Sequence, residues 1–492
     1  MLFRIAATSA VGALVLAFLG AVMGPEWQPT PLTEDVTIES SSTVVGGAPV
    51  RQPGEHEVRE EILTVELDGT SVEARLLVPE DVEEPVPGVV FVHGAGTGRY
   101  SEAFLAQAMD LATAGIATLV PDKRLDNYST RHRDYVQMAA DYEHSVELLR
   151  TVEGVDPDRV GVYAESEGCW VAPVMAVEDP SIAFVVLASA PVVPPRQQAG
   201  FAVDAYLRNT GVPLGVFRAI PRAVGMQLPG GGFEYADFDV QPWQQRLTQP
   251  VFMAYGTADA SMPVVQGAQQ VVADLAVAGN DQVTIRYYEG ANHGIKVDGE
   301  LAEGYSRDLA TWIHGLPATA TAAPRVAGAE PHQTYLAEPV PEPGWFGDGD
   351  LVVGVVVGGA GLVVLGLLGL GLFRRRAALA PGLRAPLGLF GLGCVATVVG
   401  LVWYLVAVAR LALEYERNAL VVQGGWLGVR LLGLLTVVAL AVLVERWRSV
   451  HAAPGGRLAP GAAGYVGAWT VLVGGGVLLV SLAYWGAFQL GI

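Results

Sequence analysis

The sequence predicts an α/β fold, with helices on both faces of a mostly parallel sheet, followed by an all-α transmembrane bundle. Three observations support this prediction. Strand-like apolar runs alternate with helix-length segments between residues 61 and 313. Ser166 stands at a break between a strand-like and a helix-like segment, in Ala164-Glu165-Ser166-Glu167-Gly168. Four apolar stretches of bilayer-spanning length follow residue 350.

Composition and charge divide the chain into three parts. Hydrophobic residues make up 51% of the chain and charged residues 16%, and the apolar excess lies at the two ends. The net charge of -20 comes almost entirely from the middle. A negative surface repels phosphate, so nucleic acid is not an expected partner. Cys169 and Cys394 offer neither a disulfide framework nor a metal cluster, and we expect no metal and no cofactor.

The N-terminal segment predicts export. Arg4 is followed by an uncharged apolar run, so residues 1–24 are either a signal peptide or an uncleaved signal anchor. The run is about a full membrane span and no Ala-x-Ala motif precedes Pro25, which favours the anchor. Residues 25–57 are rich in Pro, Thr, Ser and Gly, and we expect them to form a spacer.

The predicted sheet domain covers residues 58–316. It opens with a hairpin around Asp68-Gly69, and a later buried strand leads into His93-Gly94-Ala95-Gly96. Strands are expected at 62–67, 72–78, 88–92, 116–120, from 159 onward, 182–187, 251–255 and 283–288, and helices at 102–114, 134–151 and 301–313. Residues 190–249 break the alternation with Pro, Gly and scattered apolar residues, and we interpret them as an inserted lid.

Three polar residues follow predicted strands in positions suited to nucleophilic catalysis. A serine on a sharp strand-to-helix turn is lifted above the sheet, as expected for Ser166. Asp259 follows the strand at 251–255 and His293 follows the strand at 283–288, so both lie at the same sheet edge. An imidazole can take the serine proton and a carboxylate can fix its tautomer. Asp237 and Asp239 are rivals to Asp259, but neither directly follows a strand.

The order Ser166, Asp259, His293, with the serine turn and the early His-Gly-x-Gly, resembles the α/β-hydrolase superfamily over roughly residues 61–315. Pro121-Asp122-Lys123-Arg124, Asp-Pro-Asp-Arg before the serine strand and Ser-Glu-Gly resemble a branch of bacterial esterases. That branch is similar to acyl-CoA thioesterases and dipeptidyl-peptidase-like serine hydrolases. Two positions depart from the usual pattern, because Ala164 and Cys169 stand where glycines are common.

The resemblance implies an oxyanion hole formed by two backbone N–H groups. One belongs to Glu167, and the other comes from the loop Gly94-Ala95-Gly96. The Glu167 side chain is expected to complement the dipole of the helix that it starts. His93 is expected to support its loop, and Cys169 to pack in the core.

After a linker at 317–349, residues 350–492 predict four transmembrane helices, at 351–373, 387–409, 426–444 and 465–490. Arginines gather after the first and third spans, at Arg374, Arg375, Arg376, Arg384, Arg446, Arg448 and Arg457. The positive-inside rule makes these loops cytoplasmic, which places the sheet domain outside the cell membrane. Gly354 and Gly358 favour close helix packing and leave open a homo-oligomer formed through these helices.

We therefore predict a membrane-tethered serine hydrolase that cleaves carboxylic esters through an acyl-enzyme. The apolar lid favours small-molecule ester or acyl substrates with a hydrophobic part, and membrane lipid surrounds the helices. No Asp, Glu or Lys lies in the middle of a span, so we expect the helices to anchor rather than transport. A peptidase or thioesterase of the same fold is an enzymatic alternative, and a non-catalytic binding or sensing domain is the alternative from another class.

Overall fold

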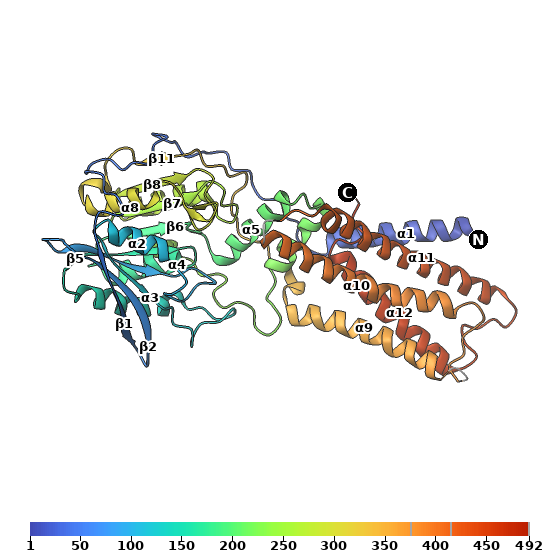
Figure 1. The fold of residues 1–492 in the computed structure, drawn as a ribbon. Helices are drawn as coiled ribbons and strands as arrows, with labels where there is room; N and C mark the ends of the chain where they lie inside the picture. The colour runs from blue at the N-terminus through green and yellow to red at the C-terminus, as the bar shows by residue number, and fades with distance from the viewer. Residues whose placement is uncertain (374–375, 414–415, 491–492) are drawn as a thin grey trace. The chain divides into compact units, whose positions relative to one another are not determined.

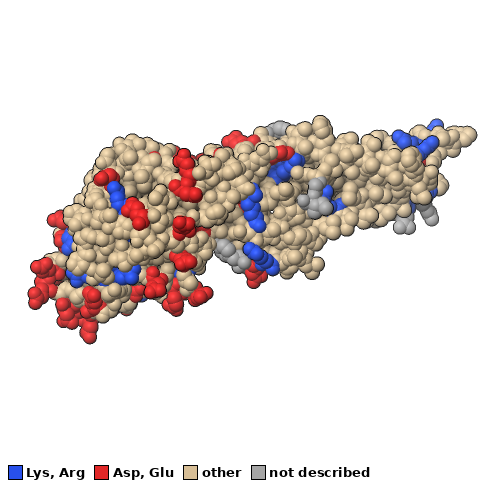
Figure 2. Space-filling view, turned by 90° about the horizontal axis from the view of Figure 1, so that it is seen from above, with Lys and Arg blue, Asp and Glu red and all other residues tan. Residues whose placement is uncertain are grey.

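The computed structural model describes residues 1–373, 376–413 and 416–490. The chain forms two units, and each unit is assembled from separate stretches of sequence. The sheet unit consists of Pro29–Ala202 and Phe233–Pro339, and the helical unit consists of Met1–Gln28, Val203–Gly232 and Val340–Ile492. Acidic side chains gather on the sheet unit, whereas the visible face of the helical unit consists mainly of uncharged residues (Figure 2).

Among the described residues, the sheet unit is built on a nine-stranded sheet (Figure 1). The strands are β1 (Val58–Leu67), β2 (Thr70–Pro79), β3 (Val86–Val92), β4 (Ala117–Pro121), β5 (Val155–Glu165), β6 (Val185–Ala188), β7 (Val251–Gly256), β8 (Val283–Tyr288) and β11 (Val326–Gly328). Their order is β1-β2-β4-β3-β5-β6-β7-β8-β11. The hairpin β1–β2 and the pair β2–β4 are antiparallel, and the remaining pairs are parallel.

Helices cover both faces of this sheet. They are α2 (Leu105–Thr113), α3 (Tyr135–Arg150), α4 (Gly168–Glu178), α6 (Gln241–Gln244), α7 (Val264–Val277), α8 (Tyr305–His314) and the short η3 (Ala318–Ala320), with α5 (Pro195–Asn209) starting in this unit. One core contains residues of α3, α4 and α7, and a second contains residues of α2 and α8. Successive strand residues face opposite sides, so Phe91 enters one core and Val90 and Val92 the other. The predicted fold class is confirmed.

Most predicted elements are found close to their expected positions, and one differs for a clear reason. The helix expected from residue 301 begins at Tyr305, because Leu301 pairs with Lys296 in a small ribbon of β9 (Lys296–Val297) and β10 (Glu300–Leu301). At the start of α3, Asp134 accepts hydrogen bonds from the N–H groups of Val136 and Gln137, which caps the helix.

The segments expected to be a spacer and a linker both run along the β8 edge of the sheet. β11 lies within the expected linker and pairs in parallel with β8, and Ser40 of the spacer bridges to Ala327 of β11. Arg286 of β8 is fully buried and donates to the carbonyl oxygens of Thr43 at 2.6 Å and Pro324 at 2.9 Å. One guanidinium thus ties both segments to the sheet.

The helical unit contains, among the described residues, five helices that are long and apolar enough to cross a membrane. They are α1 (Leu2–Val22), α9 (Gly349–Leu372), α10 (Arg384–Leu413), α11 (Gly425–Ala452) and α12 (Ala462–Tyr484), with short helical turns η1 (Leu214–Arg218), η2 (Ile220–Val224), η4 (Gly344–Gly347) and η5 (Leu420–Gly424). Only 17% of the most apolar stretch of α9 is buried, so its outer surface suits lipid. Arg374 and Arg375, used in the topology prediction, lie outside the described residues.

Glycines bring α9 and α12 into close contact, but they are not the predicted pair. A Cβ added to Gly474 would lie 2.5 Å from the carbonyl oxygen of Gly359, so the helix backbones touch there. Gly354 and Gly358 have open space around their Cβ positions among the described residues. Helix positions one residue apart face different directions. The face of α9 that packs on α12 therefore contains Gly359 but not Gly358.

The segment expected to form a lid, residues 190–249, is divided between the two units. Its middle part, Val203–Gly232, belongs to the helical unit, where the fully buried Arg222 holds it. Arg222 donates to the carbonyl oxygens of Gly20 at 3.0 Å and Gly24 at 3.1 Å near the end of α1, and to that of Tyr484 at the end of α12. Helix ends leave carbonyl groups without intrahelical donors, so this side chain caps two helices.

Candidate active site

Ser166 occupies a tight turn between β5 and α4. Its backbone is left-handed, with φ of 56°, a conformation that costs a residue other than glycine about 1–3 kcal/mol. The Ser166 N–H donates to the carbonyl oxygen of Ala188 at 3.0 Å, which fixes the turn to the end of β6. A Cβ at Gly168 would lie 2.6 Å from the carbonyl oxygen of Val92, so the approach of α4 to β3 requires glycine. The fully buried Ala164 is accommodated in β5.

Asp259 and His293 meet at the end of β7 and β8. Their loops are joined by a hydrogen bond of 3.0 Å from the N–H of Ala258 to the carbonyl oxygen of Ala291. His293 Nδ1 lies 2.8 Å from Asp259 Oδ2, while Asp259 Oδ1 accepts from the Ser261 hydroxyl at 2.6 Å. The Asp259 side chain is fully buried, whereas 33% of the His293 side chain is exposed. The carboxylate therefore orients an imidazole that solvent can reach.

The charges of this pair support each other. Burial acts to raise the pKa of Asp259, but hydrogen bonds from His293 and Ser261 and the nearby imidazolium charge outweigh it and lower that pKa. Burial acts to lower the pKa of His293, but the hydrogen bond and charge of Asp259, with a contribution from Glu165, raise it. Burial raises the pKa of Glu165, which directly precedes Ser166. The His293 imidazole is therefore protonated more readily in this site than a histidine side chain in water.

The structure places Ser166 on the same sheet edge as the Asp259–His293 pair. The end of β6 links them, because Ala188 accepts from the Ser166 N–H and the Ser189 hydroxyl donates to the His293 carbonyl oxygen at 2.7 Å. Among the described residues, the Ser166 hydroxyl makes no hydrogen bond to His293. Catalytic hydrogen bonds are often long until substrate binds, so the absence of this contact is compatible with proton transfer from Ser166 to His293.

The two expected oxyanion-hole segments lie beside Ser166. A Cβ at Gly94 would lie 3.2 Å from the Ser166 Cβ, so the loop after β3 packs directly on the serine. Glu167 is the N-cap residue of α4, where backbone N–H groups are free of intrahelical acceptors. The N–H groups of Ala95 and Glu167 have no acceptor among the described residues, which leaves both available to a ligand.

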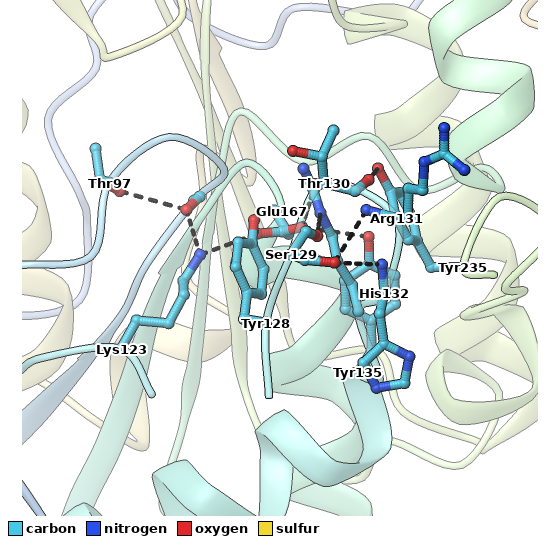
Figure 3. Close-up of polar contacts among 12 residues, drawn as sticks. Thr97, Lys123, Tyr128, Ser129, Thr130, Arg131, His132, Tyr135, Glu167 and Tyr235 are labelled. Carbon is cyan, nitrogen blue, oxygen red and sulfur yellow. Dashed lines mark hydrogen bonds and ion pairs between the residues drawn. The ribbon is translucent and has the colours of Figure 1, made fainter. Parts of the chain in front are cut away.

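The expectation that the Glu167 side chain complements the helix dipole is wrong, because this side chain turns to other partners. It makes no capping hydrogen bond, is 1% exposed and lies in a buried cluster of ion pairs and tyrosines (Figure 3). Its Oε2 accepts from Lys123 Nζ at 3.0 Å and from the Tyr128 hydroxyl at 2.9 Å, and its Oε1 accepts from Arg133 at 2.6 Å and from the Tyr135 hydroxyl at 3.4 Å. We call Lys123, Tyr128, Arg133, Tyr135 and Glu167 the Glu167 cluster.

Lys123 connects this cluster to the loop after β3. Its Nζ donates to the carbonyl oxygen of Gly94 at 2.6 Å and lies 4.5 Å from the centre of the Tyr128 ring. The Lys123 side chain is 2% exposed. Burial lowers the pKa of Lys123, while the charge and hydrogen bond of Glu167 oppose that shift. No spacing pattern in the sequence connects Lys123 with Glu167, so the sequence alone predicts no role for Lys123.

The remaining candidate residues have structural partners. His93 is fully buried with Nε2 2.7 Å from the carbonyl oxygen of Pro121, and burial lowers its pKa to about 4. Cys169 is buried against backbone carbonyl groups, and burial raises the pKa of its thiol. Asp237 pairs with Arg196, and Asp239 accepts from a backbone N–H, so neither contacts His293. The described residues contain no cluster that could hold a metal ion.

The fold and the site define the class of protein. A family model described as BAAT / acyl-CoA thioester hydrolase C terminal matches residues 140–298, a stretch that contains Ser166, Asp259 and His293. Together with the sheet order and the strand–turn–helix at Ser166, this match shows that the sheet unit has the α/β-hydrolase fold and is similar to hydrolases of the esterase and thioester hydrolase type. The similarity to serine hydrolases covers the sheet unit and does not extend to the helical unit.

Solved structures resemble the chain over about half its length. Dienelactone hydrolase from Anabaena variabilis is 20% identical and aligns over 53% of this chain and 98% of its own, with a TM-score of 0.35. Est1E from Butyrivibrio proteoclasticus is 17% identical and aligns over 48% of this chain and 91% of its own, with a TM-score of 0.34. The Pyrococcus furiosus esterase Pf2001 is 17% identical and aligns over 55% of this chain and 91% of its own, with a TM-score of 0.36. A comparison with curated proteins found no match.

Proposed function

We propose that the protein hydrolyses carboxylic esters through an acyl-enzyme formed on Ser166. The observation that carries this proposal is the 2.8 Å contact between His293 Nδ1 and Asp259 Oδ2, made on the sheet edge that holds the left-handed Ser166. With Nδ1 bound to the carboxylate, Nε2 is the nitrogen free to accept the serine proton. The three residues then act as nucleophile, base and orienting acid.

The reaction follows in two halves. Ser166 Oγ attacks the ester carbonyl while His293 takes its proton, and the N–H groups of Ala95 and Glu167 hold the resulting oxyanion. The C–O bond to the alcohol breaks as His293 returns the proton to the leaving oxygen. Water, deprotonated by His293, then attacks the acyl-enzyme, and the acid leaves as Ser166 recovers its proton. No cofactor enters any step.

We also propose that the domain is tethered on the outer side of the cell membrane. The five apolar helices and the arginines between them, including Arg376, Arg384 and Arg446, support this arrangement. An extracytoplasmic site favours esters over acyl-CoA substrates, which are cytoplasmic. Substrates with a hydrophobic part would be concentrated at the lipid surface that surrounds the helices.

The family match supports a second candidate activity, hydrolysis of thioesters. The same acyl-enzyme serves both reactions, because only the leaving group differs. Acyl-pantetheine thioesters and p-nitrophenyl esters with the same acyl group compare the two directly. A ratio of kcat/KM values that favours the thioester would replace the ester assignment.

The central test is labelling with a membrane-impermeant fluorophosphonate in intact cells. Wild type is expected to be labelled, and Ser166→Ala to be unlabelled, because only an activated serine displaces fluoride. Ser101→Ala is the matched control, since Ser101 is exposed and belongs to no part of the site. Labelling that appears only after permeabilisation would reverse the proposed orientation. Folded wild type that is never labelled would favour a binding domain instead.

A further inference from the structure

We propose that Lys123 is a positioning residue that holds the oxyanion hole in its working geometry. It fixes the Gly94–Ala95 peptide through the Gly94 carbonyl oxygen, and it is bound at the same time to Glu167, the residue after the nucleophile. This inference rests on the proposed function, because it concerns the two N–H donors assigned there. It gives the Glu167 cluster a role in catalysis rather than in stability alone.

Peptide geometry connects Lys123 to the Ala95 N–H. In a planar trans peptide, the carbonyl of Gly94 and the N–H of Ala95 point in opposite directions. The Gly94 carbonyl accepts hydrogen bonds from Lys123 Nζ at 2.6 Å and from the Thr97 hydroxyl at 3.3 Å (Figure 3). The shorter, charged hydrogen bond from Lys123 is the stronger of the two and sets the direction of the Ala95 N–H, which points away from Lys123. Gly94 packs on Ser166 on its other side, with its Cβ position 3.2 Å from the Ser166 Cβ.

Lys123 itself is buried and held by three partners. Its side chain is 2% exposed, and its ammonium group contacts the Gly94 carbonyl, the Glu167 carboxylate and the Tyr128 ring. Arg133 and Tyr128 hold Glu167 in turn. Burying an ammonium group is costly unless it is paired and hydrogen-bonded, and here each partner is provided. Both oxyanion donors thus depend on one rigid cluster.

Lys123 acts by positioning a peptide, without binding substrate or transferring a proton. The Lys123 ammonium is buried and bound to the Gly94 carbonyl and the Glu167 carboxylate, so its charge is neutralised within the protein. Oxyanion-hole donors act on the transition state, and loss of one costs about 10²–10³ in kcat. A loosened Ala95 N–H should therefore lower kcat and leave KM unchanged.

Lys123→Met tests this directly, because methionine keeps the apolar stem and removes the donor. In the purified full-length protein, with a p-nitrophenyl ester as substrate, we expect kcat to fall about 10²-fold with KM within twofold of wild type. Affinity for a trifluoromethyl ketone, which mimics the tetrahedral intermediate, should fall in parallel with kcat/KM. A merely structural role would lower the melting temperature without this parallel loss.

Two variants are compared with Lys123→Met, and the first is the control. Arg99→Met removes an exposed cation whose partner is Asp122, in the same loop as Lys123, and should leave kcat unchanged. Glu167→Gln removes the charge that holds Lys123 in place, so its kcat should fall in the same direction as that of Lys123→Met. A loss in Arg99→Met equal to that in Lys123→Met would assign the effect to the loss of any cation in this loop and overturn the proposal.

The remaining outcomes are distinct. A folded Lys123→Met variant with wild-type kcat, or with a raised KM and unchanged kcat, would also overturn the inference. If Lys123→Met does not fold, Lys123→Gln and Lys123→Arg replace it, and kcat should follow ketone affinity across them. Absence of any Ser166-dependent activity in wild type would instead refute the proposed function itself.

Discussion

At the scale of single residues, the proposed base is His293, whose pKa is raised mainly by one carboxylate, that of Asp259, with a contribution from Glu165. The fully buried Asp259 raises the pKa of His293 despite the opposing effect of burial. The base must be neutral to accept a proton, so activity is lost as pH falls through this pKa. The acid limb of kcat/KM should therefore have a midpoint above about 6.5, the ordinary value for histidine.

Asp259→Asn should move this midpoint to lower pH. The amide removes the negative charge and the strong acceptor that favour imidazolium, and it can hold the wrong tautomer. We expect kcat to fall about 10⁴-fold at neutral pH. A pH–rate profile of wild type and variant measures both effects, with Ser166→Ala as the zero-activity reference. An unchanged midpoint would show that another group sets the acid limb.

The same residues show what could be predicted from sequence. Ser166, Asp259 and His293 each follow a strand, and parallel strands end at one edge, so the order of the strands predicts that the three residues lie at the same edge of the sheet. The Glu167 cluster could not be predicted in this way. Lys123 and Arg133 reach Glu167 across 44 and 34 residues of chain, and no local pattern predicts such distant ion pairs.

At the scale of elements, the position of Ser166 depends on how closely α4 approaches β3. The carbonyl oxygen of Val92 stands where a side chain at residue 168 would begin. The alternation of strands and helices predicted this pair of elements well, because both are long and apolar. The three-residue β11 has no periodicity to reveal it, and its place depends on the distant Arg286.

Gly168→Ala should separate α4 from β3 and displace Ser166, the proposed nucleophile. Its Cβ would meet backbone at 2.6 Å, and relief by backbone movement should destabilise the protein by about 1–3 kcal/mol. We expect a lower melting temperature together with loss of fluorophosphonate labelling. Gly98→Ala is the comparison, because its Cβ would meet its nearest neighbour at an ordinary 3.6 Å. Equal effects of the two changes would contradict this account.

At the scale of the whole molecule, α1 is a member of the helical unit. It packs on α11 and α12, and Arg222 binds the carbonyl groups near its end. Removal of α1 would strip acceptors from a buried guanidinium, which costs more than the loss of a surface contact. The sequence left a cleaved signal peptide and a retained anchor open, since both begin with the same pattern of one charge and an apolar run.

We therefore predict that residues 2–22 are retained in the mature protein. Intact mass spectrometry of protein purified from membranes should give the mass of the uncleaved chain, allowing for loss of Met1. Arg222→Met should lower the melting temperature of the detergent-solubilised protein, while the exposed Arg4→Met should not. A mature N-terminus after Gly24 would contradict the prediction.

The division of the chain between the units also sets an order of events during synthesis. The sheet unit has all its residues once Pro339 has been made, before any of α9–α12 exists. Domains fold as units while the ribosome synthesises the chain, and synthesis adds about 5–20 residues per second. The hydrolase domain can therefore fold before α12 has been synthesised. At that stage α1 and the segment carrying Arg222 lack their contacts with α12. A ribosome that stops early would release a finished domain beside an unfinished bundle, with apolar helix surface left for chaperones and proteases to recognise.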